Sequence, residues 1–120
     1  MTTAIGHPVL DRIARALERG DRDALAALYA PNARYTSIDG SHPPAAPMRL
    51  SGTEVGDYIR TIPTEIRMVL DDTIVGTDGR LCLTTTCRFP DGASAVSAHV
   101  MELDGEGRIV DHRCVEAYGG

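Results

Sequence analysis

The sequence predicts an α+β fold in which three helices pack on one face of a strongly curved antiparallel sheet. Apolar residues recur at helical spacing in the first half of the chain, whereas turn signals rich in Asp and Gly divide the second half into strands. The length of 120 residues fits one compact domain, so we assign residues 1–120 to a single domain. A curved sheet covered by helices commonly leaves a ligand-binding cavity between the two layers.

Three segments in the first half carry helix boundary signals. The segment Pro8–Arg19 begins with a proline, which suits the first helical position, and has apolar residues on one face. Asp21 is an N-cap residue that predicts a second helix, which we expect Pro31 to stop. Ser51 and Glu54 form the pattern of a capping box and predict a third helix.

A short strand is expected at Arg34–Asp39, followed by a Pro-rich loop. Turn signals at Asp78-Gly79, Asp91-Gly92 and Asp104–Gly107 then separate the remaining strands. The four long strands are expected at Glu65–Val75, Leu81–Phe89, Ala93–Leu103 and Arg108–Ala117.

Charge and composition exclude several classes of partner. The net charge is −5 and the basic residues, all of them Arg, are scattered, so we expect no nucleic-acid binding. No apolar run approaches the roughly 20 residues of a membrane span, and the N-terminus lacks the pattern of a secretory signal. Because the three cysteines form no metal spacing, we expect a cytoplasmic protein whose thiols stay reduced.

Three stretches carry a family resemblance: Gly20–Ala33, Pro43–Gly52 and His99–Ile109. Together they resemble the nuclear transport factor 2-like superfamily, in particular its SnoaL-like polyketide cyclase and ketosteroid isomerase branch. The resemblance implies a cone-shaped barrel with an internal cavity. It is a weak guide to the reaction, since this fold hosts many chemistries and some members without any.

The resemblance also places the catalytic positions of ketosteroid isomerases on this chain. Their Asp base falls on Ser37, their oxyanion-holding Tyr on Ile13 and their protonated Asp on His99. All three residues differ, so we do not expect steroid isomerisation by the usual mechanism. The Asp-Arg-Asp set of the related epoxide hydrolases has no convincing match.

The strand register decides which side chains line the cavity. A two-residue turn at Asp91-Gly92 would place Thr84 opposite His99, and a four-residue turn at Asp104–Gly107 would place His99 opposite His112. Since the resemblance places His99 in the cavity, the inward face would carry Tyr35, Ser37, Asp39, Cys82, Thr84, Thr86, Arg88, Ala95, Ser97, His99, Met101, Val110, His112, Cys114 and Glu116. The apolar alternation also permits the opposite phase, with Leu81, Leu83 and Phe89 in the core.

Three residues are candidates for proton transfer. His99 can donate to a developing oxyanion or shuttle a proton, although a hydrogen-bonded structural histidine is equally compatible with the pattern. Glu116 can serve as acid or base, or it can form a salt bridge with Arg88. Asp39 can replace the missing first-strand base, or form a turn with the glycine that follows.

The candidate substrate-binding residues are Ile13, Tyr35, Ser37, Tyr58, Thr84, Ser97, Met101, His112 and Cys114. His42, beside two prolines, either leans over the cavity entrance or is solvated. A zinc site built from His99, His112, Cys114 and Glu116 is conceivable, but these residues lack the paired close spacing of dedicated sites. We therefore expect neither a metal nor a cofactor.

The functional prediction is an enzyme of the SnoaL-like type that uses cofactor-independent acid–base chemistry on an apolar, carbonyl-bearing small molecule. Cyclisation or isomerisation in secondary metabolism is the closest description, and a non-catalytic binding or accessory module with the same cavity is the alternative. We also expect a homodimer through the outer sheet face, because contiguous exposed apolar patches usually mark interfaces. That face would carry Leu81, Leu83, Val96, Val100, Ile109 and Val115.

Overall fold

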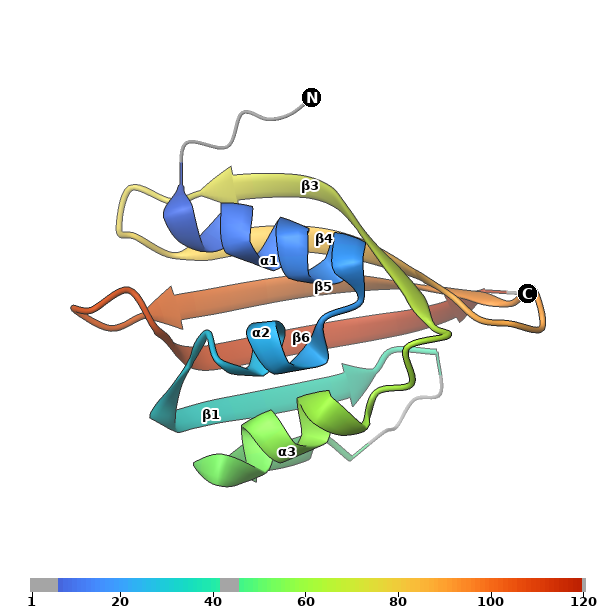
Figure 1. Ribbon diagram of the computed structural model, residues 1–120, viewed down its shortest axis with the longest axis horizontal. Helices are drawn as coiled ribbons and strands as arrows, with labels where there is room; N and C mark the ends of the chain where they lie inside the picture. Colours follow the sequence, from blue (N-terminus) through green and yellow to red (C-terminus); the bar gives the residue numbers. More distant parts are fainter. Residues whose placement is uncertain (1–6, 42–45, 120) are drawn as a thin grey trace.

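The computed structural model describes residues 7–41 and 46–119, and it confirms the predicted α+β class. Three helices lie on one face of a curved six-stranded sheet (Figure 1). The helices are α1 (Pro8–Arg19), α2 (Arg22–Ala26) and α3 (Thr53–Thr61). The strands are β1 (Tyr29–Asp39), β2 (Met48–Ser51), β3 (Arg67–Val75), β4 (Leu81–Arg88), β5 (Ser94–Leu103) and β6 (Ile109–Gly119).

The sheet is mixed and open. Its strand order is β2-β1-β6-β5-β4-β3, so β2 and β3 form its two edges and the barrel does not close. The strand β1 runs parallel to β6, while the other pairings of the described strands are antiparallel. The sequence analysis missed β2, a short edge strand that pairs with β1. Among the described residues, no helix has the length and apolar character needed to cross a membrane.

The first two helices begin where their capping residues predict. His7 accepts a hydrogen bond from a first-turn amide of α1, and Gly20 ends this helix with a left-handed φ of 65°. The Asp21 carboxylate accepts from the third amide after it, which confirms the predicted N-cap of α2. However, α2 ends at Ala26, earlier than expected. Pro31 lies instead in an irregular part of β1 that does not pair with β6. A proline, which has no backbone N–H to donate, is therefore tolerated there.

The predicted capping box of α3 is half formed. Glu54 accepts a hydrogen bond from the Ser51 amide at 3.1 Å, as expected. The N-cap residue is Gly52, and no side chain caps the first turn. A positive φ of 63° at this glycine turns the chain from β2 into the helix, a conformation that a residue with a side chain rarely adopts.

Two apolar clusters fill the space between helices and sheet. The first packs α1 against β4, β5 and β6, and includes Leu10, Ile13, Leu81 and Ile109. The second lies under α2 and α3 and includes Tyr35, Val55 and Ile59. The cavity described below lies where these clusters meet, which explains why its walls are mostly apolar.

A buried arginine ties α2 to the segment between α3 and β3. The guanidinium of Arg22 donates to the carbonyl oxygens of Ile62, Pro63 and Ile66 at 2.9–3.3 Å. These three residues also line the cavity. Arg22 therefore holds one wall of the cavity in place.

The turn between β4 and β5 has one more residue than predicted. Phe89 N–H donates to Ala93 O, and Gly92 adopts a left-handed φ of 89°, so the loop holds three residues rather than two. The shift reverses the phase of β4, and His99 lies opposite Leu83 instead of Thr84. The alternative phase is therefore the correct one for β4. Leu81, Leu83 and Thr85 face the core, while Cys82, Thr84, Thr86 and Arg88 face outward.

The turn between β5 and β6 differs from the prediction in two ways, which together shift the register by two residues and so preserve the inward phase. The loop is one residue shorter than expected, because Asp104 N–H donates to Arg108 O. An irregularity beside Leu103 then leaves Val110 outside the ladder. As a result His99 lies opposite Cys114 rather than His112, but both residues keep the inward phase. Ile109 takes the core position predicted for Val110.

Candidate functional site

A cavity of about 330 Å³ lies between the sheet and the three helices. Its volume falls at the lower end of the roughly 300–1,000 Å³ typical of sites for drug-sized ligands. Its walls are mostly apolar and include Ile13, Leu17, Met68, Leu83 and Met101. All four tyrosines of the chain also line it.

The strand β6 runs from the deep end of the cavity to its mouth. His112 and Cys114 are buried, Glu116 is half-buried and Tyr118 is 49% exposed. Tyr118 and Phe89, whose ring centroids lie 6.3 Å apart, rim the mouth together with the end of α3. The cavity therefore has a closed deep end around His112 and an accessible end beside Glu116.

Four hydrogen-bonding side chains form a row that starts at the deep end, here named the imidazole chain: Tyr29, His112, His99 and Thr85. Thr85 Oγ1 lies 2.9 Å from His99 Nε2. His99 Nδ1 lies 2.8 Å from His112 Nε2, and His112 Nδ1 lies 2.7 Å from the Tyr29 hydroxyl oxygen. The edge of the His112 ring also packs against Tyr35, with centroids 4.8 Å apart.

Burial keeps the imidazole chain uncharged. It lowers the pKa of His99 to about 4 and lowers the pKa of His112 well below its ordinary value, where the proximity of His99 contributes further. Burial also raises the pKa of Tyr29, so its phenol keeps its proton at neutral pH. The deep end thus offers neutral donors and acceptors.

The mouth end carries a carboxylate instead. Glu116 accepts hydrogen bonds from Ser37 Oγ at 3.2 Å and from the Tyr118 hydroxyl at 3.3 Å. Burial raises the pKa of Cys114 to about 11, and the nearby charge of Glu116 is the second cause. Among the described residues, Glu116 is the only acidic side chain that lines the cavity.

Residues 10–112 match the family described as the SnoaL-like domain. The chain belongs to the SnoaL-like domain family. No curated protein matches the sequence. The resemblance to the nuclear transport factor 2-like superfamily is confirmed by this match and by the solved structures described next.

Several solved structures share the fold at low sequence identity. A steroid delta-isomerase from Pseudomonas aeruginosa has a TM-score of 0.67 and 22% identity, over 89% of this chain and 75% of the isomerase. The epoxide hydrolase/cyclase-like enzyme SalBIII has a TM-score of 0.66 and 17% identity, over 92% of this chain and 88% of SalBIII. A Mycobacterium tuberculosis protein in complex with estradiol-17β-hemisuccinate has a TM-score of 0.63 and 19% identity, over 88% of each chain.

Most predicted site residues of this SnoaL-like domain lie at the cavity. Ile13, Tyr35, Tyr58, Ser97, His99, Met101, His112, Cys114 and Glu116 line it. Ser37 is buried beside the cavity and donates to Glu116. Whether any of these residues acts on a substrate stays a prediction.

The structure differs from the predicted site at three residues. Thr84 faces outward opposite Ala98, so its placement in the cavity is wrong. Asp39 does not line the cavity, and its carboxylate accepts from the Ser41 amide in the turn that was the alternative to a catalytic role. Arg88 faces outward as well, so the proposed salt bridge with Glu116 is wrong. His42 lies outside the described residues.

Sequence reasoning missed two members of the imidazole chain. Thr85 belongs to a run of three threonines, and a run of identical residues shows no alternation that would identify the inward one. Tyr29 lies in the stretch where the second helix was expected to continue up to Pro31, but it begins β1. No group of three or more His, Cys, Asp or Glu side chains in the described part of the chain is arranged to hold a metal ion.

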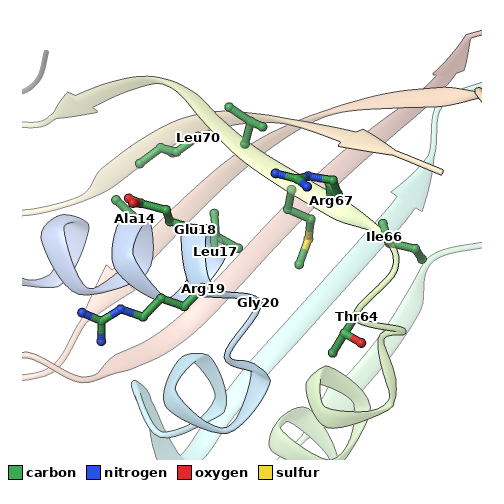
Figure 2. Close-up of a pocket in the computed structure, with 11 residues that line it drawn as sticks. Ala14, Leu17, Glu18, Arg19, Gly20, Thr64, Ile66, Arg67 and Leu70 are labelled. Carbon is green, nitrogen blue, oxygen red and sulfur yellow. The ribbon is translucent and has the colours of Figure 1, made fainter. Parts of the chain in front are cut away.

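A second hollow of about 440 Å³ lies between the C-terminal half of α1 and the beginning of β3. Figure 2 shows Glu18, Arg19 and Arg67 around it. Leu17, Ile66 and Met68 line both this hollow and the main cavity, so they form the wall between them.

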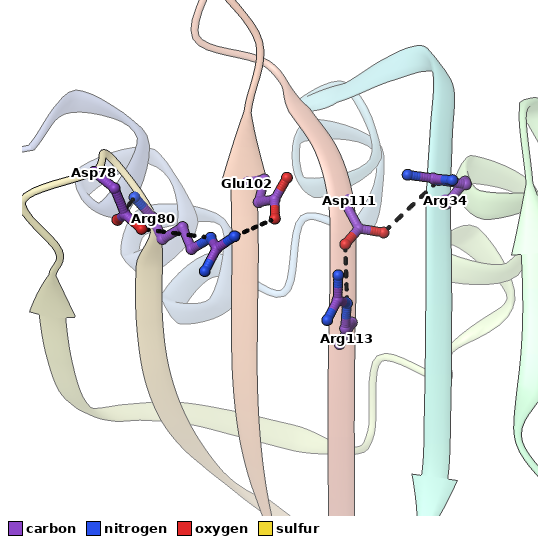
Figure 3. A network of polar contacts seen from close by, with 6 residues as sticks. All are labelled: Arg34, Asp78, Arg80, Glu102, Asp111 and Arg113. Atoms are coloured by element: carbon purple, nitrogen blue, oxygen red, sulfur yellow. Dashed lines mark hydrogen bonds and ion pairs between the residues drawn. The ribbon is translucent and has the colours of Figure 1, made fainter.

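The outer face of the sheet combines an apolar patch with ion pairs. Val96, Val100 and Val115 are 53%, 41% and 49% exposed. Next to them, Arg80 pairs with Glu102 at 3.3 Å and Arg113 pairs with Asp111 at 3.1 Å (Figure 3). The core contains three residues that were predicted on this face, because the turns before and after β5 differ from the prediction: Leu81, Leu83 and Ile109.

Proposed function

We propose that this SnoaL-like domain binds an apolar, carbonyl-bearing small molecule in its main cavity and moves protons on it by acid–base chemistry, without a cofactor. The observation that carries the proposal is one carboxylate, Glu116, that lines the same apolar cavity as a chain of neutral hydrogen-bonding side chains. Cyclisation or isomerisation in secondary metabolism is the reaction type that we infer.

The cavity supports an apolar substrate. Burial of apolar surface contributes about 25 cal/mol per Å², so a ligand that fills these walls gains affinity mainly from its hydrocarbon skeleton. The related structures support the same ligand class, since one is a steroid delta-isomerase and another holds a steroid ester. A few polar groups then orient the ligand.

The strand register supports Glu116 as the base and Thr85 as a partner of the carbonyl oxygen. Both residues lie opposite Ser97, on either side of β5. Their Cα atoms are therefore roughly 10 Å apart, two strand spacings. Allowing for the two side chains, this separation suits a carbonyl group and its neighbouring carbon.

The proposed step is enolisation. The Glu116 carboxylate takes a proton from the carbon next to the carbonyl, and the C–H electron pair becomes the C=C bond of the enolate. Negative charge develops on the oxygen, which the deep hydrogen-bonding groups stabilise. Glu116 then returns the proton to carbon. In a cyclisation, the enolate carbon instead forms a bond to a second carbonyl carbon of the same ligand, and the alkoxide that results takes the proton from Glu116.

Steroid isomerisation by the usual mechanism is excluded from the proposal. Ser37 occupies the position of the base, and Ile13 occupies the position of an oxyanion donor. Loss of one such donor alone typically costs on the order of 10²–10³ in rate. Turnover of a Δ5-3-ketosteroid at ordinary enzyme rates would contradict this exclusion.

A non-catalytic binding module remains the second candidate. The substitution at Ser37 favours it, because the first strand supplies no carboxylate to the cavity. The low pKa of His99, about 4, also favours it, because this ring is a poor proton donor at neutral pH.

The two candidates are separated by hydrogen exchange into a bound ketone. The probe is 1-tetralone in D₂O, with binding followed by the fluorescence of the four cavity tyrosines and exchange at C2 followed by mass spectrometry. An enzyme should accelerate exchange over buffer, and Glu116→Gln should reduce that acceleration by about 10²-fold or more. Binding without accelerated exchange would overturn the catalytic proposal in favour of the module. Absence of binding would overturn both.

A further inference from the structure

The imidazole chain can hold its protons in two directions. A neutral imidazole has one N–H donor and one bare nitrogen, so the direction of one hydrogen bond fixes the next. The three contacts of 2.7–2.9 Å join Tyr29, His112, His99 and Thr85 without a gap. All protons must therefore point toward Thr85 or all must point toward Tyr29.

In the first direction the protons point toward Thr85. The Tyr29 hydroxyl donates to His112 Nδ1, and His112 Nε2–H donates to His99 Nδ1. His99 Nε2–H then donates to Thr85 Oγ1. Thr85 lines the cavity, and its own O–H remains available to a ligand.

In the second direction the Thr85 hydroxyl donates a hydrogen bond to His99 Nε2, and the Tyr29 oxygen accepts one from His112 Nδ1–H. The O–H of Tyr29 then needs another acceptor. Within the described residues, His112 is the only hydrogen-bond partner of this hydroxyl. Part of the tyrosine residue is accessible, but its hydroxyl is desolvated, and an apolar ligand would displace any water beside it. A buried donor without an acceptor is costly, which disfavours this direction.

We propose that Tyr29 fixes the direction of the imidazole chain, so that Thr85 presents a hydrogen-bond donor to the ligand and selects ligands that carry an acceptor oxygen there. The inference deepens the proposed function and rests on it for the identity of the ligand class. The direction of the chain itself is a property of the protein alone. Thr85 thus becomes a specificity-determining residue, although its neighbour Thr84 was the one predicted at the site.

The direction is tested by the tautomers of the two histidines. Long-range ¹H–¹⁵N spectra of ¹⁵N-histidine-labelled protein at pH 7 distinguish protonated from bare ring nitrogens. Both His99 and His112 should carry their proton on Nε2 and keep Nδ1 bare. In Tyr29→Phe the donor is absent, and we expect a mixture of tautomers. A proton on Nδ1 of either ring in the unaltered protein, or an unchanged spectrum in Tyr29→Phe, would overturn the inference.

The selection of an acceptor oxygen is tested with a matched pair of ligands. The probes are 1-tetralone and tetralin, which differ in the carbonyl group. Thr85→Val should weaken 1-tetralone binding by roughly threefold to tenfold and leave tetralin binding unchanged, since one neutral hydrogen bond is lost. Thr85→Ser should restore the preference for the ketone, and the outward-facing control Thr84→Val should change neither affinity.

The outcomes separate the two proposals. Predicted tautomers with no binding of either probe would leave the direction of the chain standing and contradict the proposed function. Binding of 1-tetralone with equal affinity in Thr85→Val and Thr84→Val would overturn the role of Thr85 and leave the proposed function standing.

Discussion

His112 and Glu116 lie on the same face of β6 with only Cys114 between them on that face, yet their surroundings differ completely. His112 is buried, touches Tyr29 and His99 at 2.7–2.8 Å, and is held neutral. Glu116 lies toward the mouth and accepts two longer hydrogen bonds, at 3.2 and 3.3 Å. We therefore expect the deep end of the cavity to contribute to the stability of the fold, while the mouth end carries the carboxylate of Glu116.

The comparison predicts very different stability effects of substitution at the two ends. His112→Leu leaves the Tyr29 hydroxyl and a His99 ring nitrogen without partners, and we expect it to lower the free energy of unfolding by about 3 kcal/mol or more. Glu116→Gln should change it by less than about 0.5 kcal/mol, because the glutamine side-chain oxygen can still accept the two long hydrogen bonds from Ser37 and Tyr118. Urea denaturation of both variants measures the two changes in the free energy of unfolding. Equal losses would contradict the distinction between a tightly hydrogen-bonded deep end and a loosely held mouth.

The deep end should also give the fold its pH dependence. Burial lowers the pKa of His99 from 6.5 to about 4, so the unfolded chain binds this proton more readily than the folded one. The free energy of unfolding is therefore at its full value above pH 6.5, where His99 is neutral in both states. It falls as the pH drops toward 4, by on the order of 3 kcal/mol for this residue. His99→Gln, which cannot titrate, should flatten the unfolding free energy between these pH values. A slope as steep as that of the unaltered protein would show that His99 is not the cause.

The two faces of the sheet provide the next comparison, because the outer face shows exposed valines that the inner face does not. We propose that this face joins two copies of the chain, and Val100→Arg should then give a monomer or an aggregate. Each buried valine contributes roughly 1.5–3 kcal/mol before association costs. Ile74→Arg, at an exposed site on the edge strand, is the control. Light scattering that finds the unaltered protein monomeric at micromolar concentration would exclude the dimer.

The smallest expected effect concerns the charge at the mouth. Glu116 is the second cause, after burial, of the raised pKa of Cys114, about 11. Glu116→Gln should therefore lower the Cys114 pKa by a fraction of a unit. The pH dependence of alkylation of this thiol measures the change, with Cys82→Ser and Cys87→Ser in the background. A pKa that does not move would place the charge of Glu116 away from the cavity interior.

The sequence was sufficient to predict both ends of α1 and the start of α2, because Pro8, Gly20 and Asp21 have local conformational preferences. It also predicted the cavity-facing phase of β5, because His99 lies in a family pattern. The sequence was insufficient to predict the register between β4 and β5. This register depends on the number of residues in the loop before Ala93, which is three and not two. The predicted inward placement of His112 and Glu116 was correct because a shorter turn and a bulge, neither of them foreseen, together shift the register by two residues. Side-chain hydrogen bonds between distant strands, such as Tyr29 to His112, leave no local pattern at all.

The central claim is that a ligand carbonyl accepts a hydrogen bond from Thr85, at the end of the imidazole chain, while Glu116 supplies the base. The most direct measurement is the ¹³C chemical shift of 1-tetralone labelled at its carbonyl carbon, bound to the unaltered protein, to Thr85→Val and to Thr84→Val. Donation of a hydrogen bond to the carbonyl oxygen moves this resonance downfield. We predict a downfield shift in the unaltered protein and in Thr84→Val that is reduced in Thr85→Val. An identical shift in all three proteins, or the shift of the ketone in an apolar solvent, would contradict the account.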